Sequence, residues 1–418
     1  MDKLLVKGGK ALKGQVEISG SKNAILPIMA ASLMCCGEVI LNRVPELDDI
    51  NVMSEVLELL GARVKRESDV LIIDGRSAGS NELPEKISRR MRASNLVMGP
   101  LLGRFKDARV AYPGGCAIGS RPMDLHIKGF RHMGYQITED HGLMIGKADS
   151  AQGKEVMLDV PSVGATENIM MAAAMTPGTT IIRNAAREPE IVDLQNFLNR
   201  MGARVKGAGL DTIRIEGVKA LGSVEHTVIP DRIEAGTYMV AGAISRGDVW
   251  IENVVMEHLQ PLMAKLTEVG AEIIPWSGGI RIIGGSHYRP TDVKTMPYPG
   301  FPTDMQAQMM ALLATIPGTS VIVETIFENR FMHVPELRRM GADIKLEGRV
   351  AIINGKSNWE GAAVESSDLR AGAALILAGL YAQGETCIGR LEHIDRGYEK
   401  IHEKLARLGA EVERISAS

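Results

Sequence analysis

Apolar residues recur along the chain in two spacings, one typical of buried helices and one of short strands. The apolar helical stretches cover residues 24–36, 94–102, 165–175, 235–244, 305–314 and 369–382. A turn and a short run rich in β-branched residues follow several of them, at residues 178–183, 247–251 and 318–323. A second helix comes next, as at residues 191–201 and 401–408, and two strands complete the pattern, as at residues 204–206 and 212–215. The order predicted for each unit is therefore β-α-β-α-β-β.

The end of the second helix has a recurring sequence, in which an apolar residue is followed by glycine and then by alanine or tyrosine. The glycines are Gly61, Gly134, Gly202, Gly270, Gly341 and Gly409, and successive spacings are 73, 68, 68, 71 and 68 residues. A glycine directly after a helix commonly adopts the left-handed conformation that ends it. The pattern predicts six copies of one unit of about 70 residues.

Six alternating units favour an α/β (α+β) fold of two similar domains, each with three βαβαββ units. No GxGxxG follows the first strand, which argues against a dinucleotide-binding fold. The strand predicted at residues 4–8 has no partner near it in sequence, and by symmetry it completes the sixth unit. We therefore expect one domain at residues 22–229 and a second at residues 1–21 and 230–418. The chain would then cross twice between the domains, which makes a natural hinge.

Composition excludes several classes of partner. The 418 residues exceed the size of a single core, and 45% of them are hydrophobic. Lys and Arg total 48 against 51 Asp and Glu, so the net charge of −3 predicts neither a nucleic acid nor a membrane surface as a partner. The first ten residues lack the apolar core of a secretory signal, and no apolar run reaches the roughly 18 residues of a membrane span. We expect a soluble, cytoplasmic protein.

None of the four cysteines has a metal-ligand spacing, so neither a structural metal nor a disulfide framework is expected. Cys35, Cys36 and Cys387 lie in apolar patterns and are predicted to be small buried side chains. Cys116 differs, because it sits in the glycine-rich loop 112–126, five residues before Arg121 and ahead of a helix predicted to start at Asp124. Two interpretations are open: a surface loop that tolerates a cysteine, or a thiol that a nearby cation activates as an acid or nucleophile.

Polar residues begin each of the apolar helices, at residues 22–23, 92–95, 162–166, 231–234, 302–306 and 367–370. For the Asp and Ser residues, ordinary capping and binding of a phosphate at the helix N-terminus are both open. Cations oppose the helix dipole there, so Lys22, Arg92 and Arg370 are poorly explained as caps. Either they are solvated, or they join Arg121, Arg330 and Arg396 in an electropositive cleft between the domains for a substrate with several negative charges. Asp304 is the exception, a carboxylate that can take a proton from a hydroxyl.

Eight segments together resemble one family of enzymes. They are residues 20–24, 91–94, 113–116 with 121–126, 162–166, 186–190, 301–308, 327–333 and 393–398. On these segments, from residue 1 to about residue 412, the chain resembles the UDP-N-acetylglucosamine 1-carboxyvinyltransferases, the enolpyruvyl transferases that open bacterial peptidoglycan synthesis. The resemblance implies two domains of three units each (an inside-out α/β barrel), closing on the sugar nucleotide. It also implies that the 3′-hydroxyl of UDP-N-acetylglucosamine attacks C2 of phosphoenolpyruvate and phosphate leaves, without metal or organic cofactor.

The resemblance implies a role for each matching residue. Cys116 would be the general acid and Asp304 the base for the 3′-hydroxyl. The groups that would hold the phosphate are Lys22, Arg121 and Arg396, with Arg330 and Arg370 near the carboxylate of phosphoenolpyruvate. Asn23, Asp304 and the backbone of Ile326 would face the sugar. The uridine diphosphate would contact Arg92, Arg121, Pro122, Met123, Asp124, Leu125, Ser162 and Val163. Some family members have a lysine two residues before this serine, where this chain has Val160, so diphosphate contacts at that edge stay open.

Two other functions compete with this expectation. A sister enolpyruvyl transferase acts on shikimate 3-phosphate and shares the fold and phosphoenolpyruvate; Cys116 and the segment 121–125 argue against it. The second is an inactive paralogue that binds UDP-sugars and regulates the pathway. The presence of Cys116, Asp304, Lys22 and Arg396 argues against that alternative.

Overall fold

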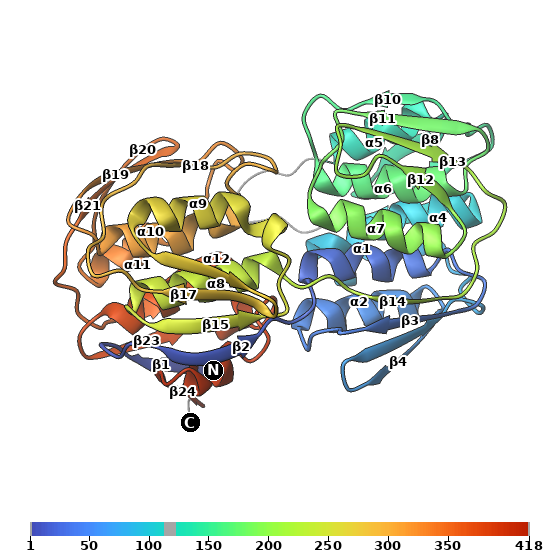
Figure 1. Cartoon of the computed structure of the whole chain (residues 1–418). Helices are drawn as coiled ribbons and strands as arrows, with labels where there is room; N and C mark the ends of the chain where they lie inside the picture. Colours follow the sequence, from blue (N-terminus) through green and yellow to red (C-terminus); the bar gives the residue numbers. More distant parts are fainter. Residues whose placement is uncertain (1, 113–122, 417–418) are drawn as a thin grey trace. The chain divides into compact units, whose positions relative to one another are not determined.

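The computed structural model describes residues 2–112 and 123–416 of the chain (Figure 1). These residues form two compact units: the first unit comprises residues 20–112 and 123–229, and the second unit comprises residues 2–19 and 230–416. The chain passes from the second unit to the first between Ser19 and Gly20, and returns between Ile229 and Pro230. Among the described residues, no helix is both long and apolar enough to cross a membrane.

Three four-stranded sheets belong to the first unit. In spatial order their strands are β14 (Val224–Thr227), β3 (Glu38–Asn42), β5 (Val70–Asp74) and β4 (Arg63–Glu67); β6 (Glu82–Leu83), β7 (Asp107–Ala111), β9 (Leu143–Lys147) and β8 (Gln136–Asp140); and β10 (Glu155–Met157), β11 (Thr179–Arg183), β13 (Thr212–Glu216) and β12 (Arg204–Lys206). In each sheet the first two strands run parallel and the remaining pairs run antiparallel. The three sheets therefore repeat one topology.

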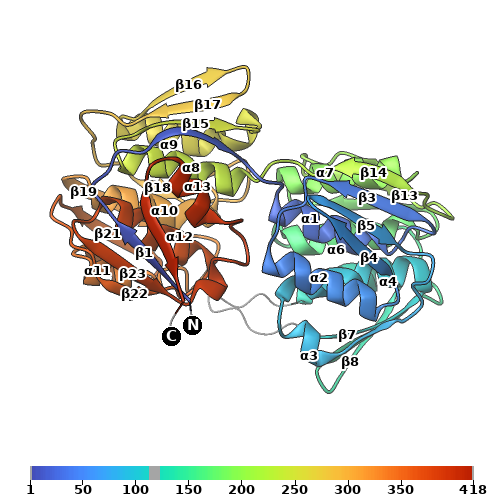
Figure 2. The same ribbon diagram turned by 90° about the horizontal axis from the view of Figure 1, so that it is seen from below.

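The second unit contains three sheets of the same kind. Their strands, in spatial order, are β2 (Lys13–Glu17), β15 (Asp248–Glu252), β17 (Gly279–Ile283) and β16 (Glu272–Trp276); β18 (Val293–Lys294), β19 (Gly318–Val323), β21 (Val350–Gly355) and β20 (Asp343–Glu347); and β22 (Ala363–Glu365), β23 (Glu385–Gly389), β1 (Lys3–Lys7) and β24 (Glu411–Ile415). Strand β1 lies between β23 and β24, antiparallel to both, with Leu5 opposite Cys387 and Glu413 (Figure 2). The expectation that the first strand completes the sixth unit is confirmed.

Two strands are exchanged between repeats, which the sequence pattern does not predict. Strand β14 precedes the first helix of the fourth repeat, yet it pairs with β3 of the first repeat, with His226 opposite Leu41. In the same way β2 precedes the first helix of the chain but pairs with β15, with Val16 opposite Ile251. Each strand thus lies in the sheet of the unit that the chain is about to leave, so the chain is held in a sheet directly before each crossing.

Each unit has fully buried helices at its centre, and other helices, such as those at Gln260–Val269 and Ile401–Arg407, that keep an exposed face. The helices of the first unit are α1 (Lys22–Ser32), α2 (Asp48–Leu59), α3 (Glu85–Ser88), α4 (Met98–Phe105), α5 (Asp124–His132), α6 (Val163–Ala174) and α7 (Pro189–Arg200), with a 3-10 helix at Arg92–Val97. Those of the second unit are α8 (Arg232–Ile244), α9 (Gln260–Val269), α10 (Gln306–Ala314), α11 (Val334–Arg339), α12 (Leu369–Tyr381) and α13 (Ile401–Arg407), with 3-10 helices at Met256–Leu259, Thr303–Met305 and Leu391–His393. Helices α8, α10 and α12 pack on one another and are buried on nearly every side, as their apolar sequences require.

Most predicted elements are present, with shifts at their ends. All six repeat glycines have positive φ, between 86° and 112°, so their predicted role after the second helix is confirmed. Helix α1 ends at Ser32, before the predicted end at residue 36. Because Cys36 lies beyond the helix on a bend, it is exposed, and the prediction of burial is wrong for it; Cys35 is buried and Cys387 half-buried.

Candidate active site

Three residues predicted to act on substrate meet in the second unit. Asp304 lies in the 3-10 helix that precedes α10, Arg330 in the turn before α11, and Arg370 in the first turn of α12. Arg330 donates to Oδ1 of Asp304 at 2.8 Å and Arg370 donates to Oδ2 at 2.9 Å. Both arginines are 4% exposed, so two buried cations share one carboxylate. Because two of these three side chains are cations and one is an anion, the cluster can bind a further anion.

Arg370 is held as a permanent cation. Burial acts to lower the pKa of its guanidinium, but the Asp304 carboxylate and other negative groups outweigh burial, and the pKa is raised above its ordinary value. Asp368 fixes the start of the helix, because its side chain accepts from the N–H groups of Arg370 and Ala371 at 2.9 and 3.1 Å. The solvated-surface interpretation is therefore wrong for Arg370.

A buried carboxylate that the sequence did not single out holds the loops around Asp304. Glu324, 1% exposed, accepts from the hydroxyl groups of Thr295 and Thr303, both at 2.9 Å. It also accepts from the backbone N–H of Ile326 at 2.8 Å. One side chain thus connects the segment of Asp304 with the segment of Ile326. Arg396, another predicted residue of this unit, lies half-buried in the turn after the 3-10 helix Leu391–His393.

In the first unit, Lys22 begins α1 and is paired. Its Nζ lies 2.6 Å from Oδ2 of Asp49 on α2, and the two side chains are 12% and 4% exposed. Burial against a carboxylate rules out the solvated-surface interpretation for Lys22. Ser21 caps the helix by accepting from the N–H of Ala24 at 3.3 Å. Asn23, the next predicted residue, is half-buried in the first turn.

The segments predicted to contact the nucleotide are linked through Asn168 of α6. Its Nδ2 donates to the carbonyl of Asn95 at 3.1 Å and to Nδ1 of His126 at 3.0 Å, while its Oδ1 accepts from the N–H of Gly99 at 2.8 Å. His126 lies on α5, two residues after Asp124. These bonds join the 3-10 helix Arg92–Val97, the first turn of α4 and the first turn of α5 to α6 within the first unit.

The linking histidine is neutral. His126 is 5% exposed, and burial, followed by the nearby Arg92 charge, lowers its pKa to about 3. Because Asn168 donates to Nδ1, the hydrogen of the neutral ring lies on Nε2. At the start of α6, Ser162 accepts from the N–H of Ala165 at 3.3 Å, and Gly164 lies so near the ring that a Cβ there would be 3.2 Å from Cε1 of His126.

Comparison with known proteins places this arrangement in a family. A family model described as EPSP synthase (3-phosphoshikimate 1-carboxyvinyltransferase) matches residues 6–405. The chain belongs to the EPSP synthase family. Within it, the chain groups with proteins named UDP-N-acetylglucosamine 1-carboxyvinyltransferase. One from Caldanaerobacter subterraneus subsp. tengcongensis is 57% identical over 412 residues, 99% of each chain. One from Carboxydothermus hydrogenoformans is 56% identical over 418 residues, all of both chains. One from Halalkalibacterium halodurans is 56% identical, covering 99% of this chain and 95% of its own.

Solved structures agree on the fold of this EPSP synthase family member. The crystal structure of the enolpyruvyl transferase NikO from Streptomyces tendae superposes with a TM-score of 0.90 at 24% identity, covering 100% of this chain and 99% of its own. EPSP synthase from Acinetobacter baumannii gives a TM-score of 0.77 at 20% identity, with both chains fully covered. The α/β fold of this chain is therefore the fold of both solved structures.

Three of the predicted site residues, Cys116, Arg121 and Pro122, lie outside the described residues. Val160, where some relatives were expected to carry lysine, is 57% exposed. No group of three or more His, Cys, Asp or Glu within residues 2–112 and 123–416 could hold a metal ion.

Capping is confirmed for Ser162, Asp231 and Asp368, but no side chain among the described residues caps the 3-10 helices Arg92–Val97 and Thr303–Met305. Ser21, outside the predicted positions, caps α1. The side chains of Ser21, Ser162, Asp231 and Asp368 each accept from N–H groups of the first turn.

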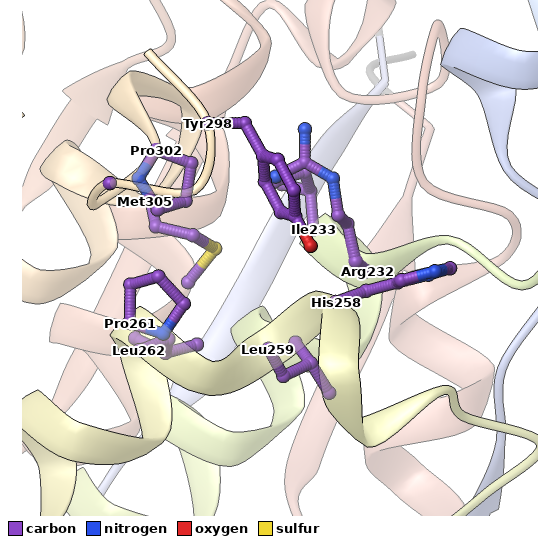
Figure 3. A pocket seen from close by; sticks show the side chains of 10 residues that line it. Arg232, Ile233, His258, Leu259, Pro261, Leu262, Tyr298, Pro302 and Met305 are labelled. Carbon is purple, nitrogen blue, oxygen red and sulfur yellow. The ribbon is translucent and has the colours of Figure 1, made fainter. Parts of the chain in front are cut away.

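One small cavity in the second unit lies beside the start of α8. Arg232, Leu259 and Tyr298 are among the residues that line it, and the Arg232 guanidinium faces the Tyr298 ring at 5.6 Å (Figure 3). Its volume of about 10 Å³ is no more than a single water needs. This cavity is therefore too small for a sugar nucleotide or phosphoenolpyruvate.

Proposed function

We propose that the chain transfers the enolpyruvyl group of phosphoenolpyruvate to the 3′-hydroxyl of UDP-N-acetylglucosamine and releases inorganic phosphate. This is the first committed step of peptidoglycan synthesis, which we place in the cytoplasm and which serves cell shape and division. The observation that carries the proposal is the Asp304 carboxylate between the buried Arg330 and Arg370 guanidiniums, in a chain 56–57% identical over nearly its whole length to transferases of that name.

The chemistry needs a base, an acid and cations. The 3′-oxygen bonds to C2 of phosphoenolpyruvate as its proton passes to Asp304, and C3 takes a proton from Cys116. The resulting intermediate then returns a proton from C3 to the Cys116 thiolate, and the bond from C2 to the phosphate oxygen breaks. The double bond is restored and the phosphate takes the electron pair. Cations already in place stabilise the charge that develops during both steps.

The remaining roles divide between the two units. In the second unit, Arg330 and Arg370 bind the carboxylate of phosphoenolpyruvate, and Arg396 binds its phosphate. In the first unit, Lys22 and Arg121 bind the same phosphate. The Ile326 N–H is already bonded to Glu324, so a contact between Ile326 and the sugar uses its carbonyl group.

The nucleotide contacts fall to the first unit. The proposed groups are Asn23 for the sugar, and Arg92, Arg121, Pro122, Met123, Asp124, Leu125, Ser162 and Val163 for the uridine diphosphate. The linkage of three of these segments through Asn168 supports a shared binding surface. With Val160 in place of a lysine, we expect no cation from that position to bind the diphosphate.

Phosphate release from phosphoenolpyruvate tests the proposal, with UDP-N-acetylglucosamine and shikimate 3-phosphate as alternative acceptors. We expect release only with the sugar nucleotide. Release only with shikimate 3-phosphate would overturn the substrate assignment. A rate equal to that of Cys116→Ala would instead support an inactive, UDP-sugar-binding protein.

A further inference from the structure

Gln308 lies on α10, one helical turn after Asp304, and its side chain is fully buried. Its Nε2 is within hydrogen-bond distance of three oxygens: the Asp304 carbonyl at 2.9 Å, the Tyr398 hydroxyl at 3.2 Å and the Thr237 hydroxyl at 3.3 Å. An amide nitrogen has two hydrogens. The shortest contact uses one of them, so Gln308 holds the backbone of Asp304.

The direction of the other bonds follows from counting hydrogens. Thr237 donates its single hydroxyl hydrogen to the Ile233 carbonyl at 2.8 Å. The bond of 2.9 Å between Thr237 and Tyr398 must then be donated by Tyr398. The Tyr398 oxygen is left to accept from Gln308. Each hydrogen bond is thus donated in the same direction: from Gln308 to Tyr398, from Tyr398 to Thr237, and from Thr237 to the backbone of α8.

The opposite end of the amide makes no such bond. Oε1 of Gln308 is buried and has no hydrogen-bond partner within the described part of the chain. A buried acceptor without a partner is destabilising. Turning the amide over would place Oε1 against the Asp304 carbonyl, where two acceptors repel. The amide nitrogen is therefore the part of this side chain that holds the Asp304 backbone and the Tyr398 hydroxyl in place.

The same network reaches the second arginine of the site. The Arg370 guanidinium carbon lies 5.5 Å from the centroid of the Tyr398 ring, and the ring is 2% exposed. A cation against an aromatic face is held by the ring quadrupole. Gln308 therefore contacts the backbone of Asp304 on one side and, through Tyr398, the support of Arg370 on the other.

We propose that Gln308 is a positioning residue, which holds the Asp304 carboxylate and the Arg370 guanidinium in the geometry that removes a proton from the substrate hydroxyl. The proposal rests on the transferase function proposed above. It extends that function to a residue that touches neither substrate nor reacting atoms.

Two glutamines on the same helix allow a matched test. Gln306 is also fully buried, but neither of its side-chain amide atoms has a hydrogen-bond partner in the described ranges. Gln308→Met and Gln306→Met therefore make the same chemical change two residues apart. In the phosphate-release assay, Gln308→Met is expected to lower kcat about tenfold to a hundredfold, because a misplaced base slows chemistry more than binding. KM for phosphoenolpyruvate is expected to rise by a smaller factor, because Arg370 also binds its carboxylate. Gln306→Met is expected to leave kcat within about twofold.

Equal kcat values for the two variants would overturn the proposal, as would a rise in KM alone. If Gln308→Met does not fold, Tyr398→Phe decides, because it removes the hydroxyl oxygen and keeps the ring beside Arg370. We expect a loss in kcat that exceeds any rise in KM, and an unchanged kcat would contradict the proposal.

Crystal structures separate this proposal from the function on which it rests. In Gln308→Met the contacts of 2.8 and 2.9 Å from Arg330 and Arg370 to Asp304 are expected to lengthen or break, and in Gln306→Met to persist. If the unaltered protein releases no phosphate with either acceptor, the proposed function fails. The two structures alone then decide the positioning role, and intact contacts in Gln308→Met would overturn it.

Discussion

Replacing Lys404 by methionine removes one partner of a buried ion pair beside the first crossing of the chain. Nζ of Lys404 lies 2.7 Å from Oε1 of Glu234 and 2.6 Å from the Ser19 hydroxyl, and the Lys404 and Glu234 side chains are 8% and 4% exposed. Ser19 also donates its N–H to Glu234 at 2.8 Å. The variant leaves the Glu234 carboxylate buried with the Ser19 N–H but without its cation, which is strongly destabilising.

The size of the loss depends on pH. Burial raises the pKa of Glu234 and Lys404 opposes that rise, so without Lys404 the pKa climbs further. A carboxyl group whose pKa is higher in the folded than in the unfolded chain loses stability as pH rises above the unfolded value. If Glu234 in the variant takes a proton, the free energy of unfolding falls by about 1.4 kcal/mol for each pH unit above about 4.3, the ordinary pKa of glutamate. The loss is then roughly 4 kcal/mol at pH 7 and about 1 kcal/mol at pH 5. The larger figure agrees with the roughly 3–5 kcal/mol typical of broken buried pairs.

Tryptophan fluorescence during urea unfolding measures the stability of the second unit, which contains Lys404 and Glu234. All three tryptophans of the chain, Trp250, Trp276 and Trp359, belong to the second unit. The control is Lys265→Met, which removes an exposed pair with Glu268 in the same unit and is expected to cost no more than about 0.5 kcal/mol. A Lys404→Met loss that is the same at pH 5 and pH 7, or no larger than that of the control, would refute the reasoning.

Two further outcomes are expected. Burial and then the Arg92 charge lower the pKa of His126 to about 3, so its ring should show no titration by NMR between pH 5 and 8. Because the unfolded chain takes up that proton near pH 6.5, His126 lowers the stability of the fold as pH falls below that value. A titration midpoint near 6.5 in the folded protein would contradict the assignment. Fosfomycin, an epoxide, is expected to alkylate the proposed acid Cys116, and mass spectrometry of the Cys116 peptide after treatment should show the adduct; an unmodified peptide would count against that role.

The repeats could be predicted because their signals are local. A glycine such as Gly202 ends a helix by its own backbone preference, and the buried central helices carry apolar residues on every side. The exchange of β2 and β14 could not be predicted, because each strand has only four or five residues, much of it polar, and pairs with a strand that follows a different helix. Pairing of this kind is determined by tertiary packing rather than by local pattern.

Some residues of the candidate site could be predicted from the sequence and others could not. Asp304, Arg330 and Arg370 stood out as charged residues in loops and at helix starts, and they are in contact. Asp49 was not predicted as the partner of Lys22, because an acid in the first turn of α2 suits the helix dipole there and needs no other reason. Gln308 lies in one of the segments that carry the resemblance, but it was given no role, since it lies within an apolar helical stretch. Its importance depends on Tyr398, which is 90 residues away in the sequence.

Mass spectrometry of the sugar nucleotide after incubation with phosphoenolpyruvate tests the central claim most directly. The account predicts that UDP-N-acetylglucosamine gains one enolpyruvyl group at the 3′-oxygen, with one phosphate released for each group transferred, and that Asp304→Asn loses this transfer while still folding. An unchanged sugar nucleotide under conditions where shikimate 3-phosphate gains the enolpyruvyl group would contradict it.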